Sequence, residues 1–104
     1  MGNYVLAYTG GSMGETAAEQ QEVMTRWMEW FGSLGSAVVD GGTPLAASAT
    51  VAPGGAVSDG ARGALSGYSV ISADGLSEAC EKAKGCPVLA AGGTIEVYES
   101  VPIG

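Results

Sequence analysis

Histidine is absent from this chain of 104 residues, and cysteine occurs only twice, as Cys80 and Cys86. Without histidine the chain lacks the commonest general base, so Ser-His-Asp catalysis, Cys-His catalysis and histidine-based metal sites are excluded. Two cysteines alone make neither a zinc site nor the disulfide framework of a small secreted protein. We therefore expect no metal, no cofactor and no set of residues typical of a known catalytic machinery.

Basic residues are also scarce, because four Lys and Arg oppose 11 Asp and Glu and leave a net charge of −7. Binding to nucleic acid requires a basic stripe, and so does attraction to an anionic membrane surface. No apolar run approaches the roughly 18 residues of a membrane span, and the N-terminus lacks the basic region of a signal peptide. The sequence predicts a soluble, cytoplasmic protein that binds neither nucleic acid nor membrane.

The chain is long enough for one domain, which we place at residues 1–104, with one apolar core. Glycine is abundant, at 18 residues, but it is not periodic, so a collagen-like repeat is excluded. Segment 43–64 is rich in small residues and glycine, is long for a connection within a domain, and holds a candidate short strand at 48–51. The sequence predicts four strands, within residues 3–9, 36–42, 67–73 and 94–100, of which the second is short.

Two helices are expected between these strands. The first begins after Thr16, which forms a capping box with Glu19, and Gly32 and Gly35 offer stop positions for it. We place Trp27 in the core, whereas Trp30 lies beside the apolar stripe and is free to reach a pocket or a partner. The stripe of this helix consists of Val23, Met24, Trp27, Met28, Phe31 and Leu34.

The second helix runs from about Leu76 to Lys84, with Asp74 as its N-cap and Pro87 as its stop. Beyond Pro87, residues 88–89 form a brief apolar link. The buried stripe of this helix consists of Leu76, Ala79, Cys80 and Ala83.

The order β-α-β-β-α-β predicts an α+β fold of the ferredoxin-like kind, a four-stranded antiparallel sheet with two helices on one face. We expect Tyr4, Leu6, Tyr8 and Tyr98 on the face that the helices leave bare. That face is too apolar to stay in water. A homodimer whose two sheets face each other, a dimeric α+β barrel, is the simplest way to cover it.

Several motifs in the chain resemble the YCII-related or DGPF-domain family, in the right order and over most of the chain. The resemblance implies a dimeric α+β barrel, small enzymes with a His-Asp pair in some members, and an association with sigma factors in others. Tyr98 stands where related sequences often have Arg, and the family's His has no counterpart. The motifs are Tyr4-Val-Leu-Ala-Tyr8, Met24, Trp27 and Trp30, Leu34-Gly35, Val39-Asp40-Gly41-Gly42, Gly67-Tyr68, Gly85-Cys86-Pro87 and Ile95-Glu96-Val97.

Asp40 and Glu96 are the candidate catalytic carboxylates. Asp40 is either a turn residue that caps backbone N–H groups or, as the resemblance suggests, a base at the barrel mouth. Glu96 lies between two residues of the helix-packed face, so its side chain points to the other face. There it is either a base with a raised pKa or a structural carboxylate satisfied by Tyr68 or Arg26.

Tyr4, Tyr8, Trp30 and Tyr98 are the candidate ligand-binding side chains, because each joins an apolar body to one polar group. The alternative is that they pack in a dimer interface. Arg62, in the long segment, is the one cation placed to meet an anionic ligand. Two functions stay open, a ligand-binding or regulatory homodimer and a small lyase- or isomerase-type enzyme that uses Asp40 or Glu96 as a base.

Overall fold

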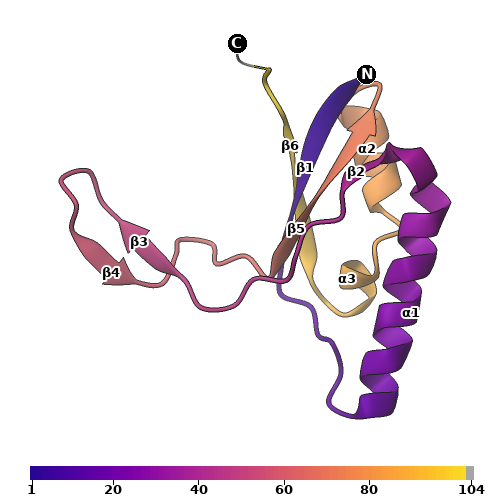
Figure 1. Cartoon of the computed structure of the whole chain (residues 1–104), viewed down its shortest axis with the longest axis horizontal. Helices are drawn as coiled ribbons and strands as arrows, with labels where there is room; N and C mark the ends of the chain where they lie inside the picture. Colours follow the sequence, from indigo (N-terminus) through magenta and orange to yellow (C-terminus); the bar gives the residue numbers. More distant parts are fainter. Residues whose placement is uncertain (103–104) are drawn as a thin grey trace.

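The computed structural model describes residues 1–102, which form an α+β structure with a four-stranded antiparallel sheet and with its helices on one face (Figure 1). The sheet contains β1 (Gly2–Thr9), β2 (Val38–Asp40), β5 (Gly67–Ala73) and β6 (Thr94–Glu99). A separate hairpin contains β3 (Ala49–Val51) and β4 (Val57–Asp59). The helices are α1 (Ala17–Leu34), α2 (Leu76–Ala83) and α3 (Pro87–Ala90), and a 3₁₀ turn (Gly35–Ala37) joins α1 to β2.

β1 lies inside the sheet, whose strand order is β2-β5-β1-β6. Its neighbours β5 and β6 both run antiparallel to it, with Leu6 opposite Ser69 on one side and opposite Val97 on the other. The four expected strands are therefore present, although β2 is shorter than its predicted segment. No helix among residues 1–102 is long and apolar enough to cross a membrane.

The start and the end of α1 are fixed by local chemistry. Thr16 Oγ1 accepts a hydrogen bond from the Glu19 amide at 3.1 Å, which confirms half of the capping box. The Glu19 carboxylate reaches back to the Glu15 amide, at 2.9 Å, rather than to that of Thr16. Gly35 ends the helix with a φ of 57°, a conformation that glycine adopts without strain.

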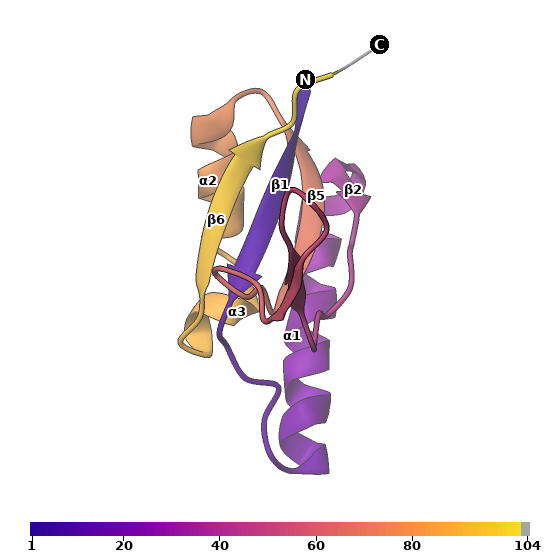
Figure 2. The same ribbon diagram turned by 90° about the vertical axis from the view of Figure 1, so that its left-hand side faces the viewer.

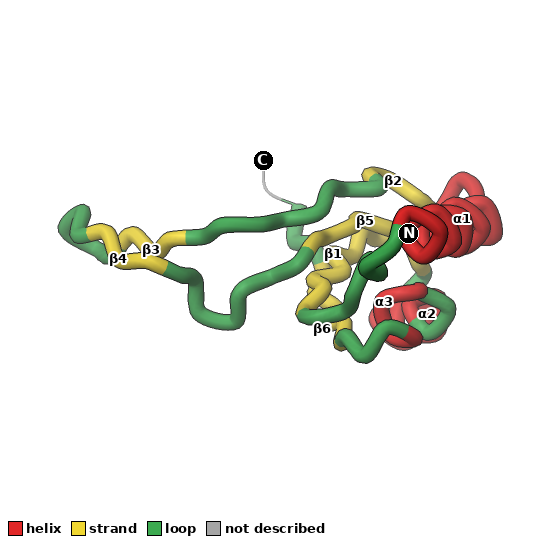
Figure 3. Tube along the Cα trace, turned by 90° about the horizontal axis from the view of Figure 1, so that it is seen from below, coloured by secondary structure: helices red, strands yellow, loops and turns green. Residues whose placement is uncertain are grey.

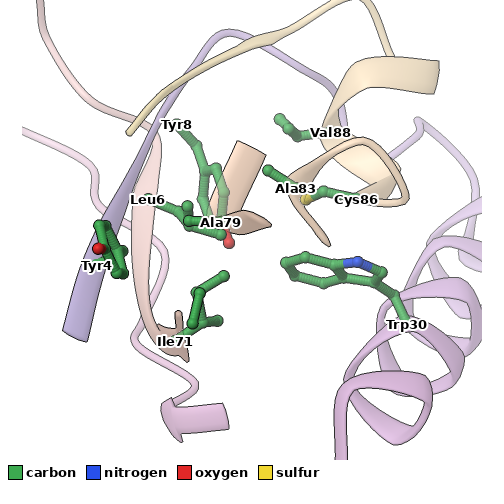
Figure 4. Packing of buried hydrophobic residues seen from close by; sticks show 10 residues of the cluster. Tyr4, Leu6, Tyr8, Trp30, Ile71, Ala79, Ala83, Cys86 and Val88 are labelled. Carbon is green, nitrogen blue, oxygen red and sulfur yellow. The ribbon is translucent and has the colours of Figure 1, made fainter. Parts of the chain in front are cut away.

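The core lies between the sheet and the helices (Figure 4). Three expected members of the bare face, Tyr4, Leu6 and Tyr8, are instead buried in this core, so that part of the prediction is wrong. Alternation places the three on one face of β1 but does not say which face the helices cover, because both are apolar. The core residues are Tyr4, Leu6, Tyr8, Trp30, Ile71, Ala73, Ala79, Ala83, Cys86 and Val88.

The two tryptophans of α1 have exchanged their expected places. Trp30 is 6% exposed and packs in the core, and its Nε1–H donates to the Lys82 carbonyl at 3.1 Å. Trp27 is only half-buried. Met28, an expected stripe residue, is 70% exposed, so the stripe turns toward Trp30 in the C-terminal half of the helix.

The second half of the chain brings three more corrections. Cys80 is exposed and not in the core, and Leu76 is 50% exposed, so α2 buries mainly Ala79 and Ala83. The cap of α2 is Gly75, not the Asp74 side chain. Pro87 begins a short helix, α3, where a stop followed by an extended link was expected.

Segment 44–66 leaves the body of the protein as a projecting hairpin, which we call the arm (Figures 1 and 3). Within it β3 pairs antiparallel with β4, Ala49 opposite Asp59 and Val51 opposite Val57. The candidate short strand is thus confirmed and has a partner that the sequence did not indicate. The arm raises the radius of gyration to 15.1 Å, against about 13 Å for a compact chain of this length.

The sheet face away from the helices, the open face, carries the other side chains of the inner strands. Across it Val5 lies opposite Val70 and Tyr98, and Ala7 lies opposite Tyr68 and Glu96. Tyr98 is 55% exposed there, as the sequence predicted for this one tyrosine. Figure 2 views this face with the arm in front of it, so the arm projects on the open side of the sheet.

Candidate functional site

A cavity of about 510 Å³ opens at the end of the sheet where β1 finishes and β5 begins. It lies between α1 and α3, and the loops that leave β1 and β2 also line it. We call it the Trp27 cavity. Its apolar walls include Tyr8, Met24, Trp27, Phe31, Pro44 and Val88.

Aromatic rings form the wall on the side of α1. Trp27 meets Tyr8 edge to face, with ring centroids 5.3 Å apart and planes at 67°. Phe31 lies one turn along the helix, 5.8 Å from Trp27. These distances are typical of favourable aromatic pairs, so each ring holds the next in place. The wall is therefore built before any ligand arrives.

Glycine permits the loops that line the cavity to approach neighbouring residues closely. Gly42 has a φ of 77°, and a Cβ added there would lie 1.7 Å from the Tyr68 carbonyl oxygen. A Cβ on Gly11 would lie 2.8 Å from Val88 Cγ2. Asp40 Oδ1 accepts a hydrogen bond from the Gly42 amide at 2.8 Å and fixes this turn. The shape of the cavity thus depends on positions that larger residues cannot occupy.

The polar groups that line the cavity are mostly engaged within the protein. Ser66 Oγ donates to the Gly10 carbonyl and Ser69 Oγ to the Gly41 carbonyl, both at 2.8 Å. Among the residues that the structure describes, no Asp, Glu, Lys or Arg lines the cavity. The interior therefore offers a ligand apolar and aromatic surface and no fixed charge.

The Tyr8 hydroxyl is the exception to this satisfied set. Tyr8 is 4% exposed, and its Oη is buried without a hydrogen-bond partner in the part of the chain described. It points from the ring into the core (Figure 4). Burial raises the pKa of the phenol above its usual value.

Of the side chains proposed to bind a ligand, only Tyr8 lines the Trp27 cavity. Tyr4 and Trp30 are in the core, and Tyr98 lies on the open face. Arg62 is exposed in the arm and does not line this cavity. The structure therefore does not bring the predicted ligand-binding residues together around one cavity.

The two candidate catalytic carboxylates lie on opposite edges of the sheet. Asp40 ends β2 and Glu96 is in β6, with β5 and β1 between them. Three strand spacings separate these edges by roughly 14 Å. Both carboxylates are exposed, and Glu96 accepts a 3.5 Å hydrogen bond from Tyr98 Oη rather than from Tyr68 or Arg26. They do not form one site.

Sequence reasoning missed most of the cavity. Trp27 and Phe31 were assigned to the helix stripe, which they occupy, but a stripe does not show where the helix runs past the end of the sheet. Gly11, Gly42 and Pro44 signal turns after β1 and β2, which end at the same end of the sheet, and this is the one pattern that pointed to this end of the molecule.

Comparison of the chain with family models, with curated proteins and with solved structures finds no match. The likeness to YCII-related and DGPF-domain proteins therefore stays a prediction from the motifs. Within residues 1–102 no three His, Cys, Asp or Glu side chains gather in a way that would hold a metal ion. The geometry of the Trp27 cavity is therefore the feature of the molecule that bears on its function.

Proposed function

We propose that the protein is a ligand-binding domain whose Trp27 cavity takes a small, uncharged and largely apolar molecule. The observation that carries this proposal is an open cavity of about 510 Å³ with a preformed aromatic wall. Ligand sites usually have volumes of about 300–1,000 Å³ and apolar linings with few polar groups.

Charge narrows the class of ligand. The chain has a net charge of −7, and none of its four basic residues lines the described cavity. An anionic ligand would lose its hydration there and gain no cation. A flat, neutral molecule can stack on Trp27 and contact Met24, whose thioether adapts to irregular shapes.

We also propose a specific topology and assembly for this fold. The strand order β2-β5-β1-β6 supports a ferredoxin-like arrangement, and the apolar part of the open face supports a homodimer in the manner of an α+β barrel. Membership in the YCII-related or DGPF-domain family and an association with a sigma factor are proposals that depend on the motif resemblance alone.

The structure favours binding over acid-base catalysis. Asp40 is engaged in a turn through the Gly42 amide, and Glu96 lies on an exposed part of the open face. Neither carboxylate lines the Trp27 cavity. The arrangement of these carboxylates therefore supports a binding role better than lyase or isomerase activity.

The test uses two probes with the same naphthalene ring and different charge, 1-naphthol and 1-naphthoate. Calorimetric titration should give binding of neutral naphthol with a Kd on the order of 0.1–1 mM, typical for a ligand of this size. Naphthoate should bind at least tenfold more weakly. Equal affinity for both, or no binding of naphthol, would contradict the proposal.

Two methionines of α1 provide a matched pair of variants. Met24 lines the cavity and is 50% exposed, whereas Met28 is 70% exposed and does not line it. Met24→Lys places a charge at the cavity rim and should weaken naphthol binding at least tenfold. Met28→Lys makes the same chemical change one turn later and should leave naphthol binding unaltered. Equal effects of the two substitutions would mean that the probe binds elsewhere.

A further inference from the structure

The arm has internal hydrogen bonds but little contact with the rest of the chain. Ala52 donates to the Ala56 carbonyl at 2.8 Å, and Thr50 Oγ1 donates to the Gly60 carbonyl at 2.6 Å. Apart from half-buried Thr50, every residue from 45 to 65 is exposed. An isolated two-stranded hairpin is marginally stable in water, so an ordered arm requires a surface to pack against.

One face of the hairpin is suited to such packing. Val51 lies directly opposite Val57, so the two side chains share a face, and each is 69% exposed. Large apolar side chains at this exposure on both strands indicate a contact with another molecule. Within residues 1–102 the arm finds no such contact.

The direction of the arm indicates which surface it contacts. The three views agree that the arm leaves the body on the open side of the sheet, away from the helices (Figures 1–3). Eight extended residues span roughly 26 Å, whereas two sheets pack about 10 Å apart. An arm of this length can therefore reach the sheet of a second copy that packs on the open side.

The charged residues of the arm and of the open face indicate which two residues meet between the copies. Asp59 and Arg62 are the only charged residues of segment 44–66. Arg62 forms no ion pair within the described chain, and neither does Glu96, the one acid among the open-face positions named above. A single guanidinium on the arm and a single carboxylate on the open face are complementary between two copies related by a two-fold axis, where the contact occurs twice.

We infer that the arm of one copy lies against the open face of a second copy, with Arg62 beside Glu96 of that copy and with Val51 and Val57 packed on its apolar strands. This inference rests on the homodimer proposed above and adds the segment and the charge pair that hold it. Two reciprocal arms bury the exposed valines and add to the contact between the two copies.

Charge reversal tests the pair directly. Sedimentation velocity over a range of micromolar protein concentrations should show a dimer for the wild type. Arg62→Glu and Glu96→Arg should each raise the dimer dissociation constant at least tenfold, and the double variant should return it to within threefold of wild type. Both side chains are exposed, so the subunit fold should be kept, which far-UV circular dichroism verifies.

Two control variants make the same changes elsewhere. Arg26→Glu reverses a basic residue on α1, and Glu99→Arg reverses the acid of β6 opposite buried Tyr4, on the other side of the sheet from Glu96. Neither should move the dissociation constant more than threefold. Hydrogen exchange provides a second measurement, because the Ala52 and Gly60 amides should exchange more slowly as the dimer forms.

The outcomes separate the two proposals. A wild type that stays monomeric would overturn both the homodimer and the arm contact. A dimer that is indifferent to both reversals would overturn the arm contact alone. Weakening by each reversal without recovery in the double variant would also overturn it, because the two residues would then act independently.

Discussion

Replacing Tyr8 by phenylalanine removes one oxygen from the core and leaves the ring in place. In the wild type this hydroxyl is buried and has no hydrogen-bond partner in the described chain, whereas the ring contacts Trp27 edge to face. Tyr8→Phe therefore removes a polar group that lost water on folding and gained nothing in return. We expect the variant to be more stable than the wild type.

The magnitude follows from two opposing terms. A buried polar group without a partner costs about 1–3 kcal/mol, which the substitution recovers. The contacts of one lost oxygen atom are together worth about 0.5–1 kcal/mol. The net gain in the free energy of unfolding is about 1 kcal/mol, or roughly 4 °C in Tm for a chain of this length.

Urea denaturation measures this gain, and the m-value should stay constant because the surface exposed on unfolding hardly changes. Tyr4→Phe is the matched control. Tyr4 is also a buried tyrosine of β1, but its hydroxyl is not among the buried polar groups that lack a partner. Tyr4→Phe should therefore change the free energy of unfolding little. Destabilisation of Tyr8→Phe by 1 kcal/mol or more, an outcome of the size a normal hydrogen bond would give, would refute the reasoning.

The pH dependence gives a second readout of the same group. Burial raises the pKa of Tyr8 above the unfolded value of about 10, so the folded state holds this proton more tightly. The stability linked to it is fully present below about pH 10 and is lost as the pH rises further. Tyr8→Phe should lose less stability than the wild type over that alkaline range, and equal losses would contradict the assignment.

Two further predictions concern glycine and cysteine. Gly42→Ala should destabilise by more than about 3 kcal/mol in urea denaturation, because its Cβ would overlap the Tyr68 carbonyl, whereas Gly32→Ala, which has open space in α1, should stabilise by about 0.5–1 kcal/mol. A small loss at Gly42 would show that the turn can move. Exposed Cys80 should react with iodoacetamide at mildly alkaline pH, whereas burial raises the pKa of Cys86 to about 11 and should keep it unmodified. Mass spectrometry after digestion distinguishes the two sites, and equal labelling would contradict this difference.

Much of the sheet could be predicted because its signals are local. The alternation in residues 67–73 predicted β5 to the residue, and Thr16 marked the start of α1 correctly, whereas of the two candidate stops, Gly32 and Gly35, the helix ends at the second. The choice of face was not local. Both faces of β1 are apolar, so only the packing of the helices decides that Tyr8 is buried while Tyr98 is not.

The site could be predicted only in part, for a related reason. The Trp27 cavity forms where α1 extends past the end of the sheet, and the spacing of apolar residues along a helix does not reveal that offset. Pro87 illustrates a second ambiguity, because proline ends one helix and also suits the first position of the next. The arm was recognised as an unusual segment, but its direction depends on the three-dimensional path of β2 and β5.

The base of the arm and the rim of the Trp27 cavity are the same piece of chain. Pro44 and Leu45 at one root and Ser66 at the other line the cavity, and the Leu45 amide donates to the Ser66 carbonyl at 2.9 Å. If a ligand and a neighbouring subunit both restrain these roots, the two equilibria are thermodynamically linked and each must change the other by the same factor. The affinity for naphthol would then vary with protein concentration, so that diluting the protein would change how tightly it binds the ligand.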